Sequence, residues 1–185
     1  MKMLYIFVSL LIILIAIVYL YNRFIRLDNM VKEAWADVNV QLKRRYSLIP
    51  NLVTIVKGYM KYESKTLKEI VALRNTAIHQ NTPAQKEDSE NQITENLKHL
   101  FVVAEKYPDL KSNEQFKELA SNLAEIENTL QIARRYYNAT VRDYNIAIHS
   151  FPSSLLANCL TLKDKAYFEI APFETKNIKV DLNEK

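Results

Sequence analysis

The pattern of apolar and polar positions begins with one unbroken apolar stretch. Residues 3–21 are apolar or aromatic except at Ser9, which matches the roughly 20 residues needed to cross a bilayer core about 30 Å thick. The pattern predicts a transmembrane anchor over residues 1–22. A cleaved secretory signal is the alternative, but residues 18–21 are bulky where a cleavage site needs small side chains, and their two tyrosines suit a membrane interface.

Helical periodicity continues directly after this stretch. Apolar residues recur at three- and four-residue steps, so we expect the membrane helix to run without a break into the body: Leu27, Val31, Ala34, Trp35, Val38 and Leu42. The basic residues 43–45 suit the negative end of a helix dipole and predict that this helix ends there. A second helix is expected to start within residues 47–51, because Pro50 is tolerated in a first turn. Residues 41–59 would then form a corner, with Gly58 at a point of close packing.

A polar connection and two more helices follow in the pattern. The second helix extends to about Ala77, and residues 76–90 lose the apolar spacing, which predicts one long polar connection. A third helix is expected to end before Pro108, because the residue preceding a proline disfavours the helical region. The fourth and longest helix, over about residues 113–150, carries a coiled-coil-like seam: Leu119, Leu123, Ile126, Leu130, Ala133, Tyr137, Val141, Tyr144, Ile148 and Phe151.

Together these elements predict an all-α protein. Its N-terminal transmembrane helix would continue into an antiparallel up-and-down bundle of four long helices, because short connections make neighbouring helices antiparallel. A short helix is expected within residues 153–162. The predicted division is an anchor over residues 1–22, a helical bundle over residues 23–162 and an extended C-terminal tail over residues 163–185.

Composition narrows the classes of function. The chain has one Gly and five Pro in 185 residues, against average contents of about 7% and about 5%, so it lacks the Gly-rich phosphate loops of nucleotide-binding proteins. The net charge of +4 is mild and its charges alternate in sign, so we predict no nucleic-acid binding. Cys159 is the only cysteine, which rules out an internal disulfide and fits a reducing compartment.

Basic residues flanking the anchor predict its orientation. Lys2 lies on one side, whereas Arg23, Arg26 and Lys32 lie on the other. The positive-inside rule therefore places the body in the cytoplasm of a single-pass protein of the bacterial cell membrane.

The sequence contains no recognisable reaction centre. Its three histidines are scattered, and Glu95 with His99 is a single pair where a metal site usually needs three or four ligands. Cys159 has no evident activating neighbour, and no hydrolase motif is present. We therefore predict no catalytic residue, no metal ligand and no cofactor-binding residue, and hence no enzyme activity.

Several ordered motifs along nearly the whole chain resemble the LemA family of bacterial membrane-anchored proteins. They are AWADVNVQLKRRYSLIPNLV at residues 34–53, KGY at 57–59, AEKYPDLK at 104–111, ARRYYNATVRDYN at 133–145 and SFPSSL at 150–155. The resemblance implies a helical bundle domain, a poorly defined biochemical role and relatives implicated in magnetosome membrane formation. This chain departs from the family pattern at two positions, because family members often carry Asp where Ser47 stands and His where Tyr62 stands. Ser47 can still cap a helix, whereas Tyr62 leaves Glu63 without a neighbouring imidazole.

Polar residues within or beside these motifs form the candidate site. Charges beside apolar stripes are costly unless they are paired, so the set is either a structural network of ion pairs and caps or a polar pocket or partner-docking surface. Asn138 and Asn145 are seven residues apart and share a helix face, where they could fix the register of the seam. The candidates are Arg44, Arg45, Asn51, Lys57, Glu105, Glu127, Arg134, Asn138 and Asn145.

Two functional hypotheses follow from an anchor, a helical body and no reaction centre. The first is a non-catalytic scaffold or adaptor that organises membrane proteins or the envelope, with the lipid bilayer and other membrane proteins as partners. The alternative is a sensing module in which Arg44, Arg45 and Arg134 bind an anion or another ligand at the bundle end. Membrane remodelling by the body has thinner support, from Arg23 and Arg26, and oligomerisation remains open.

Overall fold

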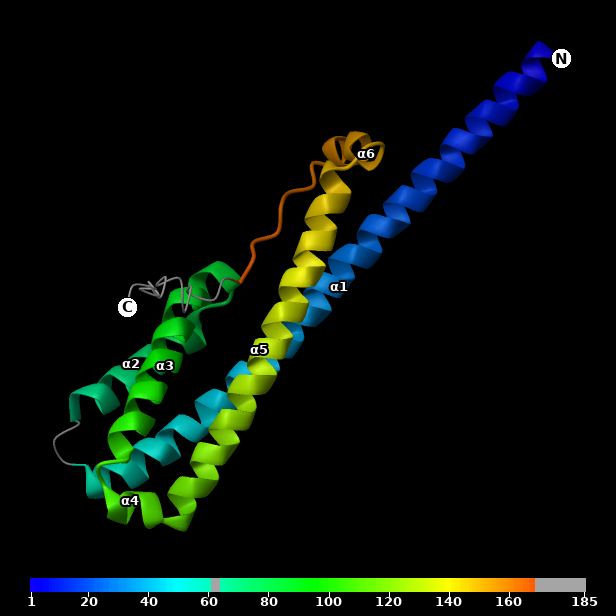
Figure 1. Cartoon of the computed structure of the whole chain (residues 1–185). Helices are drawn as coiled ribbons and strands as arrows, with labels where there is room; N and C mark the ends of the chain where they lie inside the picture. Colours follow the sequence, from blue (N-terminus) through cyan, green and yellow to red (C-terminus); the bar gives the residue numbers. More distant parts are fainter. Residues whose placement is uncertain (61–63, 169–185) are drawn as a thin grey trace, which may run out of the picture.

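The computed structural model describes residues 1–60 and 64–168, and these residues form an all-helical fold. The helices are α1 (Lys2–Tyr59), α2 (Ser64–His79), α3 (Pro83–Ala104), α4 (Pro108–Ser112), α5 (Glu114–His149) and α6 (Ser153–Cys159). No strand occurs within these two ranges. The prediction of an all-α protein with a short helix after Pro152 is confirmed (Figure 1).

Helix α1 is 58 residues long and runs from the N-terminus to the far end of the body. Its N-terminal part is the one described segment long and apolar enough to cross a membrane, and none of that window is buried. Packing against the body starts at the half-buried Leu20 and the buried Phe24. The predicted continuity between the apolar stretch and the body is therefore confirmed.

The predicted corner at residues 41–59 is wrong, because α1 continues through Pro50 to Tyr59. Proline has no N–H, so it leaves the carbonyl group of residue 46, four positions earlier, without its helical donor. Nε of Arg74 on α2 donates to this carbonyl oxygen of Tyr46 at 2.8 Å. A tertiary contact thus replaces the missing helical hydrogen bond and helps the helix to tolerate Pro50.

Two smaller expectations for this segment also fail. Ser47 caps no helix, since it lies inside α1 and its hydroxyl donates to the carbonyl oxygen of Arg44 at 2.7 Å. Gly58 is not at a close approach, because a Cβ atom built there would meet nothing within 4 Å. Tyr62 and Glu63 lie outside the described residues.

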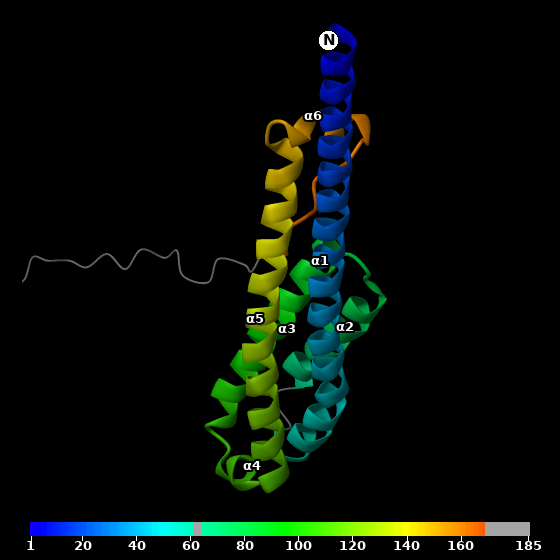
Figure 2. The same cartoon turned by 90° about the vertical axis from the view of Figure 1, so that its right-hand side faces the viewer.

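Helices α2 and α3 form a hairpin that packs beside the C-terminal half of α1 (Figures 1 and 2). The long polar connection predicted over residues 76–90 is wrong, because only Gln80, Asn81 and Thr82 separate the two helices. Thr82 and Gln85 make a capping box, and Pro83 occupies the first turn of α3. The apolar spacing is lost here because Lys86 and Glu90 take inward positions.

Helix α5 runs antiparallel to α1 and packs along it (Figure 1). At 36 residues it matches the predicted fourth helix, and most of its predicted seam is buried, including Leu123, Leu130 and Val141. Phe151 is an exception, because it follows the end of α5 and is 82% exposed. Its assignment to the core seam is therefore wrong.

The chain after α6 returns along α5. Residues 163–168 form no helix or strand, and they contact α5 through the backbone of Lys165, Ala166 and Phe168. Phe168 is buried, and its ring meets that of Trp35 on α1 edge-on with centroids 5.6 Å apart. The rest of the predicted extended tail, residues 169–185, lies outside the described residues.

Candidate functional site

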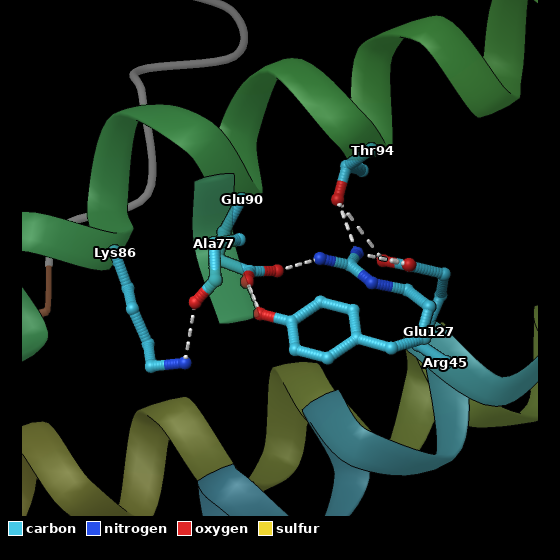
Figure 3. A network of polar contacts seen from close by, with 7 residues as sticks. Arg45, Ala77, Lys86, Glu90, Thr94 and Glu127 are labelled. Carbon is cyan, nitrogen blue, oxygen red and sulfur yellow. Dashed lines mark hydrogen bonds and ion pairs between the residues drawn. The ribbon is translucent and has the colours of Figure 1, made fainter. Parts of the chain in front are cut away.

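The most distinctive feature of the body is a network of polar side chains in its interior. Arg45 occupies an inward position of α1, in register with the apolar stripe of that helix. Glu90 and Thr94, one turn apart on α3, and Glu127 on α5 reach toward it (Figure 3). The site therefore depends on three helices that meet only in the folded body.

The Arg45 guanidinium group joins these helices. Its Nη2 atom pairs with Glu90, and its Nη1 atom pairs with Glu127 and donates to the Thr94 hydroxyl at 2.8 Å. Thr94 in turn donates to Glu127 at 3.3 Å. The side chains of Arg45 and Glu90 are both 0% exposed, whereas that of Glu127 is 23% exposed. The pair with Glu90 is thus a buried salt bridge, in which each charge depends on the other.

Tyr46 and Lys86 extend the network, and Lys86 connects it to α2. The Tyr46 hydroxyl donates to Glu90, and burial raises the pKa of this tyrosine to about 12, so it stays protonated at neutral pH. The Lys86 ammonium group donates to the carbonyl oxygen of Ala77 on α2 at 3.0 Å and lies 5.5 Å from the centre of the Tyr46 ring. Burial, with a smaller effect of Lys43, lowers the pKa of Lys86.

Arg134 adds a further charge to this interior. It is 4% exposed, and its Nε and Nη2 atoms are buried without a hydrogen-bond partner among the described residues. Its guanidinium carbon lies 4.6 Å from the centre of the Phe168 ring, a cation–π contact. Burial, followed by the positive charge of Arg45, lowers the pKa of Arg134 to about 10. Three cationic side chains, Arg45, Lys86 and Arg134, thus accompany two carboxylates, Glu90 and Glu127.

The geometry suits a structural role better than chemistry on a substrate. Glu90 accepts from both Arg45 and Tyr46 and is excluded from solvent, so it is not free to take up a proton from a bound molecule. Buried ion pairs that link several helices can specify one arrangement of those helices. Here both Nη atoms of Arg45 are paired, whereas its Nε atom is buried without a hydrogen-bond partner among the described residues. Among the described residues, no group of three or more His, Cys, Asp or Glu side chains converges as a metal site would.

The structure brings together only some of the residues predicted from the sequence. Arg45, Glu127 and Arg134 meet in the interior. Arg44 and Asn51 lie elsewhere, in exposed positions on α1, and Lys57 is exposed in its last turn. Glu105 is exposed beyond α3 and pairs with Lys111.

Asn138 and Asn145 bind the backbone of the returning segment. Asn138 donates to the carbonyl oxygen of Phe168 at 3.0 Å and accepts from its N–H at 2.9 Å. Asn145 makes the same pair of bonds with Lys165, at 3.0 and 2.9 Å. Seven helical residues and three extended residues both span about 10 Å, so the heptad spacing of the asparagines matches the chain they hold. They fix this segment to α5, not one helix to another.

A polar groove lies between α1 and α5 on the surface. Two adjoining clefts share Leu48 and Asn122, and together they bring Arg44 and Asn51 to one face. We call this surface the α1–α5 groove; its polar lining is Arg44, Ser47, Asn51 and Thr54 from α1 and Gln115, Glu118, Asn122 and Glu125 from α5.

The sequence reasoning missed Glu90, Tyr46, Thr94 and Lys86. All but Tyr46 lie on α3, in or just after the segment assigned to a loop. A signal was present, because residues 86, 90, 93, 97, 100 and 104 are spaced as one helix face. Counting Lys86 and Glu90 as inward positions of that face would have found the partner of Arg45.

Comparisons with known proteins agree with the family resemblance. The sequence pattern of the LemA family matches residues 34–182 of this chain. Protein LemA of Metamycoplasma hominis is 25% identical over 167 residues, which cover 88% of this chain and 74% of the relative. Magnetosome proteins MamQ 1 and MamQ 2 of Paramagnetospirillum magneticum are each 22% identical over 178 residues, which cover 82% of this chain and 65% of each relative. The chain therefore spans less than two thirds of these magnetosome proteins.

Proposed function

Because the chain belongs to the LemA family, we propose that it is a membrane-anchored helical scaffold or adaptor without catalytic activity. The observation that carries the proposal is the single helix α1, which joins an apolar, unburied N-terminal segment to the packed body. A force or a position imposed on the body is transmitted directly to the anchor, because no flexible linker lies between them.

The proposed topology is a single pass through the bacterial cell membrane with the body in the cytoplasm. Arg23 and Arg26 follow the apolar segment, and both are exposed, which supports this orientation through the positive-inside rule. We propose an anchor over residues 1–22, an antiparallel up-and-down bundle over residues 23–162 and a C-terminal tail over residues 163–185. The names of the magnetosome relatives support a role in membrane organisation.

A scaffold needs a stiff body and an accessible docking surface. The ion pairs of Arg45 with Glu90 and Glu127 support the first requirement, because they connect three helices in the interior. The α1–α5 groove supports the second, since its polar side chains are open to solvent. We propose that a membrane-protein partner docks there, and oligomerisation through the same groove is an outcome of the test.

Photo-crosslinking tests this docking surface. A photoreactive residue at Asn51 or Asn122 of the full-length chain in native membranes should yield a discrete crosslinked product, whereas one at the exposed Glu95 of α3 should not. Reversing two groove charges, with Glu118→Lys and Glu125→Lys together, should weaken the interaction about tenfold or more, which is about 1.4 kcal/mol. Crosslink yield measured by mass spectrometry reports the change.

The matched control reverses two exposed acidic residues outside the groove, Asp37→Lys and Glu95→Lys. It should leave the yield from Asn51 unchanged. Equal yields from the groove and from Glu95, or equal losses in the two charge-reversal variants, would remove the groove as the docking surface. A crosslink to a second copy of this chain would make it a contact of an oligomer.

The alternative function, an anion- or ligand-sensing module, is favoured by one observation. Arg134 carries buried guanidinium atoms without hydrogen-bond partners among the described residues, and such a group attracts an anion. This anion site would include only one of the three arginines predicted from the sequence. Arg45 is already paired with two carboxylates, and Arg44 lies in the α1–α5 groove.

Inorganic phosphate is a suitable probe for this alternative. If an anion reaches Arg134, the melting temperature of the full-length chain in detergent should rise with phosphate concentration more than with chloride at equal ionic strength. Arg134→Met should abolish the difference, while Arg135→Met, at the exposed neighbouring position, should retain it. Identical phosphate responses in the wild-type chain and in Arg134→Met would exclude Arg134 as the anion site.

A further inference from the structure

The turn after α5 and the helix α6 expose large apolar side chains. Phe151 is 82% exposed and Leu155 is 62% exposed. Cys159 is also exposed and lies one turn after Leu155, so both point from the same face of α6. The opposite face, with Ser153 and Ala157, is buried against the body. We call the exposed surface formed by Phe151, Leu155 and Cys159 the foot.

The foot lies at the end of the body from which the apolar segment of α1 projects. α6 packs against α1, and a cleft beside it is lined by Tyr21, Phe24 and Ile25 of α1 together with residues 160–165. Figures 1 and 2 both show α6 beside the N-terminal, blue part of α1, at the opposite end of the body from α4. The foot therefore lies level with the last residues of the predicted membrane span.

No spacer separates the span from the body. The apolar stretch ends at Tyr21, and Phe24, only three residues later, is already 3% exposed. Three residues of helix rise about 4.5 Å, less than the depth of a headgroup layer. If the N-terminal part of α1 crosses a bilayer, the end of the body that carries α6 must lie at the surface of that bilayer.

We infer that the foot inserts Phe151 and Leu155 into the interface of the same bilayer that α1 spans. The transfer of exposed apolar side chains from water to the headgroup and acyl boundary lowers the free energy. The inference rests on the proposed anchor, and the continuity of the foot with that anchor favours lipid over a protein partner as the occupant.

The charges around the foot suit a lipid surface. Arg23, Arg26 and Lys163 are exposed at this level and can meet lipid phosphates. The acidic residues nearby are already paired, Asp28 with Lys32 and Lys165, and Asp164 with His149. A second contact beside the spanning helix limits how α1 can tilt and rotate, so it orients the body relative to the membrane.

The single cysteine provides a direct test. A nitroxide spin label on Cys159 of the full-length chain, placed in nanodiscs of phosphatidylcholine with phosphatidylglycerol, should collide more with oxygen than with a water-soluble nickel complex. That preference marks a buried position. The double variant Phe151→Ser and Leu155→Ser should lose it, because the foot no longer partitions into the bilayer.

Four controls separate the foot from the anchor and from folding. Replacing the exposed apolar residues Val102 and Ile132 with serine should leave the label at Cys159 buried. In a Cys159→Ser background, a label at Leu11 reports insertion of the anchor, and a label at the exposed Ser112 of α4 should remain in water. Circular dichroism should show the same helix content in every variant, because each replaced side chain is exposed.

The outcomes distinguish the two proposals. A buried label at Leu11 with a fully aqueous label at Cys159 would overturn the foot while the anchor stands. Aqueous labels at both positions would overturn the anchor, and the foot with it. A buried Cys159 label that does not respond to the double variant would assign the burial to a surface other than Phe151 and Leu155. A burial signal that depends on protein density in the nanodisc would indicate a second copy as the occupant.

Discussion

Replacing Arg45 with methionine is expected to lower the free energy of unfolding of the full-length chain by about 3–5 kcal/mol. Arg45 and Glu90 are both fully buried, and removing the guanidinium group leaves the Glu90 carboxylate with the Tyr46 hydroxyl as its remaining side-chain donor among the described residues. An unpaired charge in the interior is the costly state. Urea unfolding in detergent, followed by circular dichroism, measures the change.

Arg44→Met is the matched control, because Arg44 is exposed at the adjacent position and surface substitutions usually change stability by less than about 0.5 kcal/mol. Replacing Arg45 and Glu90 together with methionine should recover part of the loss, since both buried charges are then removed. If the losses from Arg45→Met and Arg44→Met are equal, the buried pair does not stabilise the helix arrangement.

Replacing Asn138 and Asn145 together with alanine is expected to lower the free energy of unfolding by about 2–6 kcal/mol, at roughly 0.5–1.5 kcal/mol for each of the four hydrogen bonds lost. These bonds join the backbone of Phe168 and Lys165 to the two asparagine side chains of α5. Their loss should release residues 163–168 from the helix.

Amide hydrogen exchange provides a readout specific to the attachment. The N–H groups of Lys165 and Phe168 donate to the asparagine side chains, so they should exchange faster in the double variant, while the interior of α5 stays protected. Asn122→Ala, in the exposed groove on the same helix, should change neither value. Unchanged protection at both amides would show that the asparagines do not hold the segment.

The long stripes of α1 and α5 could be predicted because their inward positions are mostly apolar. Val31, Ala34 and Val38 on α1, and Leu123 and Leu130 on α5, are buried as their spacing predicts. Apolar residues at three- and four-residue steps report a helix face without knowledge of its partner. The candidate residues Arg45 and Glu127 were found because they lie within or beside such stripes.

The predictions of secondary structure failed where a contact with a residue distant in sequence overrides the local conformational preference. Pro50 was expected to begin a helix, but Arg74 of α2 supplies a donor to the carbonyl group that Pro50 leaves free. Residues 83–90 were expected to be a loop, although Lys86 and Glu90 face inward because Ala77, Arg45 and Tyr46 bind them. None of these four partners is adjacent in sequence to the residue it affects, so local propensity indicated the wrong structure.

The sequence by itself determined the helical class, the apolar N-terminal segment and its continuity with the body, because these depend on periodicity and on the transfer of side chains from water. Its motifs also determined the family. Only the tertiary structure decided that Arg45 pairs with Glu90, that Asn138 and Asn145 hold a backbone segment, and that Phe151 faces outward. These outcomes depend on which groups from distant helices can satisfy a buried charge or hydrogen bond, and that choice is made by packing.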